Sequence, residues 1–267
     1  MIEYYVEAIS TYAADIDQII LAITLIVGAF FFISELLIFY FIWKFKDKGD
    51  GKKAQYITGD EKKQKRPVKI AHNLVLLCDL VLVFFAIKVW MEVKQDLPPA
   101  DQQVRIIGQQ WAWTFQHPGP DGVLDTYPPP PGSDDIMLID ELHIEVNKTY
   151  HYKLVSKDVI HDFSVPVFRL KQDAVPGREI TGWFKAKKIP KGGMADIQCA
   201  EMCGIGHGLM AGIIYIESAE DHASWLASHT VPSTSTEKQA ANDAAVNDNR
   251  KPIETVAGAE LAARTAP

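Results

Sequence analysis

The stretch IILAITLIVGAFFFISELLIFYFIW, residues 19–43, decides the architecture of this chain. Its 25 residues carry one formal charge, on Glu35. As a helix rising about 1.5 Å per residue it would measure roughly 37 Å, longer than a hydrocarbon core of about 30 Å. A second block, residues 70–92, begins IAHNLVLLCDLVLVFFAIKVW and contains Asp79. Because neither block has an apolar face opposite a polar one, we predict two membrane-spanning helices rather than buried core helices.

The charges around the two blocks predict their orientation. Residues 44–69, which connect them, hold ten Lys or Arg against four acids, so the positive-inside rule places this basic loop in the cytoplasm. Residues 1–18 hold four acids and no Lys or Arg, which predicts an outer segment and not the basic start of a cleaved signal peptide. The hairpin would therefore deliver the chain after residue 92 to the outer face.

Residues 93–230 are predicted to form one outer β-domain. Short β-rich segments separated by Pro- and Gly-rich turns are typical of an antiparallel sandwich or barrel. We expect strands at 104–107, 137–146, 149–155, 179–184 and 212–216, and a short helix near 220–228. Residues 231–267 are rich in Ser, Thr, Ala, Asn and Asp, which predicts a disordered tail.

The composition excludes two classes of protein. A net charge of -7 and a pI near 5.6 argue against a nucleic-acid-binding protein. Three cysteines in 267 residues are too few for a disulfide-stapled mini-protein. We predict that Cys78, within the second apolar block, is a packing residue.

The stretch QCAEMCGIGHGLM, residues 198–210, concentrates side chains that bind metals. Cys199 and Cys203 are followed by His207 and Met210, and this soft donor set suits copper. The best candidate for a second histidine is His161. The second cysteine suggests two copper ions bridged by both sulfurs. A disulfide in an oxidising compartment and a zinc site of two Cys and two His remain alternatives, but only copper gives Met210 a role.

Four stretches resemble subunit II of haem-copper cytochrome c oxidases: GQQWAWTF (108–115), DVIHDFSVP (158–166), LKQDAVPGR (170–178) and the metal-binding stretch above. The resemblance covers residues 19–230. It implies a two-helix transmembrane hairpin plus an all-β, cupredoxin-like Greek-key barrel that carries a dinuclear copper centre, CuA.

The resemblance also implies the copper ligands: His161, Cys199, the backbone carbonyl of Glu201, Cys203, His207 and Met210. The two thiolates would bridge the ions. His161 with Met210 would complete one ion, and His207 with Glu201 the other.

Three further roles follow from the same resemblance. The carboxylate of Glu201 would contribute to a magnesium site at the border with subunit I. Trp111 would be the residue through which an electron from cytochrome c enters, whereas Trp113 is expected in the core.

The implied function is a one-electron relay within an oxidase. Subunit I, with its haems and copper, would reduce oxygen to water coupled to proton translocation. Other partners would be subunit III, a c-type cytochrome and membrane lipid, with no nucleic acid, in a bacterial rather than a mitochondrial inner membrane. The rival functions are a CuA-bearing subunit of a nitric oxide reductase and a membrane copper-delivery or redox-sensing protein.

Acidic residues form two further groups of candidates. Residues 94–230 hold eighteen acids against twelve bases, a balance that would steer a basic cytochrome c towards this domain. The candidates for docking, whose alternative reading is as solvated turn residues, are Asp125, Asp134, Asp135, Glu141 and Asp158. Within the spans, Glu35 and Asp79 are costly in lipid unless they face protein or water. We expect them to pair with subunit I or to act in proton delivery; the alternative is a protonated carboxyl group that is hydrogen-bonded within the helix pair.

Overall fold

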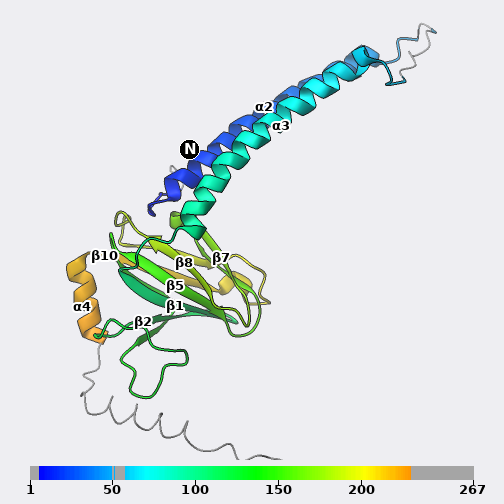
Figure 1. Cartoon of the computed structure of the whole chain (residues 1–267). Helices are drawn as coiled ribbons and strands as arrows, with labels where there is room; N and C mark the ends of the chain where they lie inside the picture. Colours follow the sequence, from blue (N-terminus) through cyan, green and yellow to red (C-terminus); the bar gives the residue numbers. More distant parts are fainter. Residues whose placement is uncertain (1–5, 50, 52–57, 230–267) are drawn as a thin grey trace, which may run out of the picture.

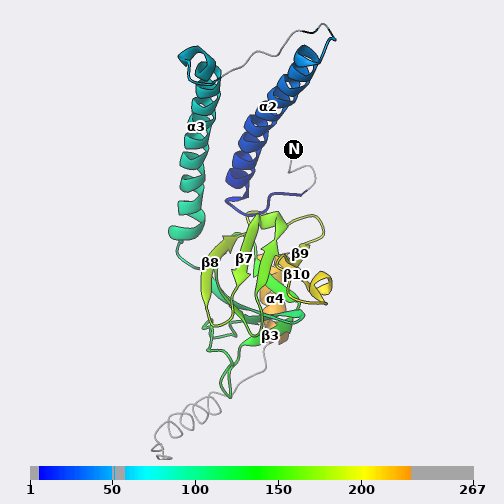
Figure 2. The same ribbon diagram turned by 90° about the vertical axis from the view of Figure 1, so that its right-hand side faces the viewer.

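The structure is a computed structural model that describes residues 6–49, 51 and 58–229. Two long helices, α2 (Ala13–Phe45) and α3 (Lys62–Trp90), leave the same side of a β-rich domain (Figures 1 and 2). Both are long and apolar enough to cross a membrane, and their large apolar side chains are mostly exposed. Part of the basic loop (50, 52–57) and the predicted tail (231–267) lie outside the described residues.

Both helices extend beyond the apolar blocks. The first begins at Ala13 and the second at Lys62, so the last part of the predicted basic loop is helical. Lys and Arg are good helix formers, which lets α3 start before its apolar block. Asp79 is exposed on the surface of α3, whereas Glu35 and Cys78 are half-buried.

The β-domain consists of two five-stranded sheets that enclose one core (Figure 2). A π-helical turn, η1 (Met91–Gln95), leads into it from α3. The first sheet has the order β3-β2-β1-β5-β8. Its strands are β1 (Gln102–Gln109), β2 (Ala112–His117), β3 (Ile136–Ile139), β5 (Thr149–Ser156) and β8 (Ile180–Lys185).

The second sheet has the order β4-β10-β9-β6-β7. Its strands are β4 (Glu141–Glu145), β6 (His161–Val165), β7 (Leu170–Ala174), β9 (Met194–Cys199) and β10 (Ala211–Glu217). Two pairs, β1 with β5 and β4 with β10, are parallel, so the chain crosses between distant strands and does not form a simple meander. This architecture, two apolar helices followed by a cupredoxin-like β-domain, confirms the predicted fold class.

Alternation of side chains builds the core. Along β5, Tyr150, Tyr152 and Leu154 are buried, whereas the alternating residues His151 and Lys153 are more exposed, as expected for a strand with one face in the core. Trp113 is fully buried, as predicted, and its ring packs edge-on against Phe163 of the opposite sheet. Burial of such aromatic side chains holds the two sheets together.

The predicted single strand over 137–146 is wrong, because Asp140 divides it between the two sheets. Asp140 has a φ of 60°, and its carboxylate accepts a hydrogen bond of 2.8 Å from the backbone N–H of Trp113. A left-handed residue ends one strand and redirects the next. Strands β2, β6, β7 and β9 had no matching prediction from the sequence.

The segment before the first helix is part of the β-domain. Ile9 and Tyr12 are fully buried, and Ser10 forms a β-bridge with Ala186. Arg169, on the turn after the 3-10 helix η2 (Pro166–Phe168), binds both carboxylate oxygens of Asp17 at 2.7 and 2.8 Å. The outer end of α2 is thereby attached directly to the β-domain.

A last helix, α4 (Ala219–His229), packs against one edge of the β-domain (Figure 1). It confirms the short helix expected near 220–228. Its Trp225 ring stacks on His143 of β4 with centroids 4.4 Å apart.

Candidate metal centre

The connection between β9 and β10 carries most of the predicted ligands. Cys199 is the last residue of β9, Cys203 lies in the following loop, and His207 begins the 3-10 helix η3 (His207–Leu209). Met210 directly precedes β10. His161 is the first residue of β6, which pairs with β9 so that Phe163 stands opposite Cys199. The sheet therefore brings a residue 38 positions away to the loop.

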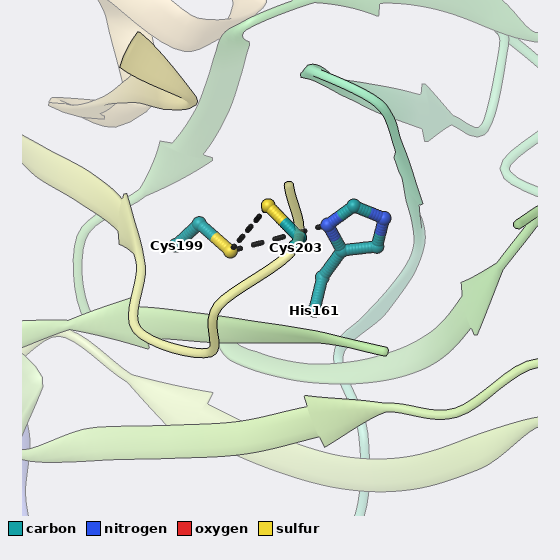
Figure 3. A group of neighbouring side chains, drawn as sticks. All are labelled: His161, Cys199 and Cys203. Carbon is teal, nitrogen blue, oxygen red and sulfur yellow. Dashed lines mark hydrogen bonds between the residues drawn. The ribbon is translucent and has the colours of Figure 1, made fainter. Parts of the chain in front are cut away.

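The side chains of these residues converge. The sulfur atoms of Cys199 and Cys203 lie 3.7 Å apart, and Nδ1 of His161 lies 3.9 Å from the sulfur of Cys199 (Figure 3). On the other side, the Cys203 sulfur lies 3.7 Å from Nδ1 of His207 and 3.9 Å from the sulfur of Met210. The group His161, Cys199 and Cys203 meets the distance requirement for holding a metal ion.

Most of the side chains that form the centre are buried, and His207 is half-buried. His161, Cys203 and Met210 are buried, and Cys199 is only 9 % exposed. The carbonyl oxygen of Glu201 lies 3.3 Å from the Cys199 sulfur, while the Glu201 side chain is exposed. The backbone and the carboxylate of this residue thus face different surroundings.

The donor set fits copper better than the alternatives. The two cysteines are not bonded to each other, and both are free thiols. A zinc site of two Cys and two His would leave Met210 unused, although its sulfur is buried beside that of Cys203. Burial, together with the adjacent Cys199, raises the pKa of the Cys203 thiol to about 11. A bound cation is therefore needed to hold both sulfurs as thiolates.

Asp158 orients His161. Its Oδ1 lies 2.8 Å from Nε2 of His161, and its Oδ2 accepts a 2.7 Å hydrogen bond from the backbone N–H of Gln110. A proton on Nε2 leaves Nδ1, the atom nearest to Cys199, with a lone pair for a metal. These hydrogen bonds and that of the Val159 N–H lower the pKa of Asp158, although partial burial opposes them.

Trp111 lies directly over the metal loop. Its indole N–H donates to the carbonyl oxygen of Cys203 at 3.1 Å, and the side-chain amide of Gln110 donates to the same oxygen at 2.8 Å. The Trp111 side chain is 39 % exposed, so one edge of the ring reaches solvent. A β-carbon on Gly206 would come within 2.4 Å of the indole, which shows how closely the ring covers the loop.

The other acidic candidates lie elsewhere on the domain. Asp125, Asp134 and Asp135 bring carboxylate oxygens together in the long connection between β2 and β3. Asp135 accepts hydrogen bonds from Gln116 and from the backbone N–H of Asp125, so much of its charge is engaged. Glu141 is exposed at the start of β4.

Sequence reasoning missed the supporting residues of the centre. It treated Asp158 as a docking residue, although both its carboxylate oxygens bind groups of the β-domain. It gave no role to Gln110 or to the contact between Gly206 and Trp111. The spacing of Asp158 three residues before His161 was the one available signal for the first of these.

Comparison with known proteins gives a consistent result. The family model described as cytochrome c oxidase subunit II, periplasmic domain, matches residues 102–219. Cytochrome c oxidase subunit 2 of Cereibacter sphaeroides is 31% identical over 229 residues, which cover 76% of this chain and 72% of that protein. Alternative cytochrome c oxidase subunit 2 of Bradyrhizobium diazoefficiens is 37% identical over 145 residues, 48% of this chain and 51% of that protein.

A crystal structure of the periplasmic domain of subunit II of cytochrome oxidase of Bradyrhizobium japonicum is also similar. It is 31% identical, covers 50% of this chain and 96% of that domain, and has a TM-score of 0.42. The match to the first relative extends over about three quarters of each chain. This chain therefore belongs to the cytochrome c oxidase subunit II family.

Proposed function

We propose that this chain is the electron-accepting subunit of a haem-copper cytochrome c oxidase in a bacterial inner membrane. The observation that carries the proposal is the convergence of two thiols 3.7 Å apart with a histidine beside each sulfur. The relatives, which are named as subunit 2 of cytochrome c oxidases, support the oxidase over a nitric oxide reductase.

Cys199 and Cys203 would bridge two copper ions, and the remaining four ligands would complete the centre: His161, His207, Met210 and the carbonyl of Glu201. When bound, such a dinuclear copper centre supplies one-electron oxidation and reduction. The protein would contribute a fixed set of donors. His161 and Cys199 sit on paired strands, and Asp158 fixes the imidazole, so the ligands hardly need to move.

Trp111 would form the entry for the electron. Its ring is partly exposed to solvent, and its indole N–H donates a hydrogen bond to the carbonyl oxygen of Cys203. It thus links the surface that a cytochrome c can reach to a bridging ligand of the centre. Among the tryptophans of the described residues, Trp111 is the one that hydrogen-bonds to this loop.

Other subunits would complete the reaction. Subunit I, with its haems and copper, would reduce oxygen to water coupled to proton translocation, and subunit III would accompany it. The backbone carbonyl of Glu201 faces the Cys199 sulfur, whereas its side chain is exposed to solvent. The carboxylate could therefore bind a magnesium ion shared with subunit I while the carbonyl faces the copper centre. The two apolar helices anchor the chain, with its C-terminal domain on the outer side of the membrane.

Replacing Cys203 by Ser tests the proposal. The wild-type complex should give the paramagnetic resonance signal of one unpaired electron shared by two copper ions, and Cys203→Ser should lose it because one bridge is missing. Cys78→Ser is the matched control, since Cys78 lies in α3 far along the chain from the loop, and it should keep the signal.

Two results would contradict the proposal. A shared-electron signal that survives in Cys203→Ser would rule out bridging by this sulfur. Purification of the chain without haem-bearing subunits, and with copper that is readily exchanged, would favour the copper-delivery function instead.

A further inference from the structure

A basic hollow lies against the first sheet of the β-domain, and none of its lining residues belongs to the metal loop. Its volume is about 330 Å³, and its walls come from β1, from the end of β5 and from the turn that precedes β8. A β-bridge between Ser156 and Pro176 joins the end of β5 to the turn that precedes β8. A hollow of this size suits a small ligand.

The charge of the lining is opposite to that of the domain. Arg105, Lys157 and Arg178 contribute three cations, and Glu179 contributes the one carboxylate among the lining residues. Residues 94–230 as a whole carry more acids than bases. A local excess of cations in an acidic domain creates a positive potential that attracts an anion.

Arg105 is the central feature of the hollow. Its side chain is only 7 % exposed, and Nη1 donates to the Gln116 side chain and to the carbonyl of Asp125, both at 2.7 Å. These acceptors are neutral. The nearest carboxylate oxygen, on Glu179, lies 3.9 Å from Nη2, and Glu179 is half exposed. The Arg105 guanidinium therefore has one carboxylate partner, at a long distance and half exposed to solvent, and an anion that binds beside the buried cation would add to its stabilisation.

The other two cations are available at the rim. The Lys157 ammonium lies 5.1 Å from the centre of the Tyr127 ring, a cation–π contact that holds it at the wall. Arg178 is exposed in the turn that contains Gly177 and forms no ion pair within the described residues. Planar guanidinium groups bind phosphate oxygens in pairs, so two arginines and a lysine favour a phosphate group over a monovalent halide.

From this juxtaposition of Arg105, Lys157 and Arg178 we infer that the hollow is a binding site for a phosphate group, carried by inorganic phosphate or by a small organic phosphate. The site is independent of the copper ligands and of the proposed electron relay. The ligand would bind from the outer compartment, on the side to which the β-domain is delivered.

The test is isothermal titration calorimetry, in which inorganic phosphate is added to the full-length chain in a detergent and buffer free of phosphate. Inorganic phosphate should bind at millimolar concentration, and chloride at equal ionic strength should not. Arg178→Gln and Lys157→Gln should each weaken binding by about tenfold, because each removes a charged hydrogen bond. Both residues are exposed, so these variants should keep the fold, which thermal unfolding checks.

The matched control is Lys153→Gln, because Lys153 pairs with Arg105 across the same sheet but is not among the residues that line the hollow. It should change the affinity by less than about twofold. Adenosine monophosphate is tested as a second ligand to distinguish the two kinds of phosphate. If it binds more tightly than inorganic phosphate, the ligand of the hollow is an organic phosphate; if it binds equally, the ligand is the inorganic ion.

Two outcomes would overturn the inference. One is the absence of phosphate binding by the folded chain. The other is an equal loss of affinity in Lys153→Gln and Arg178→Gln, which would mean a diffuse electrostatic effect and no site. Arg105→Lys serves as a further check, since it keeps the charge and should still weaken binding by losing the paired geometry.

Discussion

At the scale of single residues, the position of one proton on His161 depends on Asp158. The carboxylate accepts from Nε2 at 2.8 Å, and Nδ1 is the atom that points towards Cys199. Partners of this kind raise the basicity of a ligating imidazole and fix its ring. Asp158 is thus a positioning residue of the centre.

Asp158→Asn should weaken copper retention by about 10- to 100-fold, because the uncharged amide no longer stabilises the required tautomer. Competition with a copper chelator measures this. Glu141→Gln also removes one carboxylate from the domain, at an exposed position on β4, and should leave retention unchanged. Equal losses in the two variants would show that overall charge, not the hydrogen bond, controls retention.

Two glycines of the metal loop allow a matched comparison. A β-carbon at Gly206 would lie 2.4 Å from the Trp111 ring, whereas one at Gly208 would have nothing within 4 Å. Gly206→Ala should therefore displace the indole and slow electron transfer from cytochrome c by about tenfold or more, as expected for a misplaced contact. Stopped-flow reduction of the centre measures the rate.

Gly208→Ala is the control and should reduce at the wild-type rate. If Gly206→Ala also kept that rate while its tryptophan fluorescence showed a displaced ring, Trp111 would not be the entry point for the electron.

At the scale of elements, the attachment of α4 is the part most sensitive to pH. Trp225 of this helix packs edge-on to His117 and stacks with His143 and His222, and Glu217 binds Nδ1 of both His143 and His222. Complete burial, with a smaller contribution from His143, His222 and His229, lowers the pKa of His117 from 6.5 to about 3. Between pH 6.5 and about 3, His117 is protonated in the unfolded chain but stays neutral in the folded protein.

The stabilising contribution of neutral His117 is therefore present above pH 6.5 and is lost as the pH falls towards about 3. The loss amounts to about 1.4 kcal/mol per pH unit in this window. His117→Phe keeps an aromatic ring but removes the titrating group. Between pH 6 and pH 5 the free energy of unfolding of the wild type should therefore fall by about this amount relative to that of the variant. Denaturant unfolding in detergent measures it, and a constant difference would contradict the assignment.

The connections between elements were the least predictable part of the fold. The alternating pattern correctly indicated strands such as β5, but it did not indicate the break at Asp140, where a left-handed residue sends the chain from one sheet to the other. Nor did it indicate that Ile9 and Tyr12 are core residues of the β-domain. Both depend on partners more than 25 residues away in sequence, which a local pattern does not contain.

At the scale of the whole molecule, charge should control the encounter with the electron donor. The outer domain carries eighteen acids against twelve bases in residues 94–230, so a basic cytochrome c is attracted over a distance of about one Debye length. The rate of reduction by cytochrome c should fall by about tenfold or more as ionic strength rises, whereas reduction by an uncharged small molecule should not change. A rate for cytochrome c that is independent of salt would exclude steering by this surface.

The sequence by itself determined the membrane hairpin, its orientation and the nature of the metal loop. Each depends on features that are local in the chain: runs of apolar residues, blocks of charge, and four donors within twelve positions. Only the tertiary structure placed His161, already a candidate from the sequence, beside Cys199, and only it showed that Asp158 sets the tautomer of His161 and that three cations, including the buried Arg105, meet in one hollow. Strand pairing brings these residues together, and pairing is set by the burial of side chains across the whole core, which no single segment encodes.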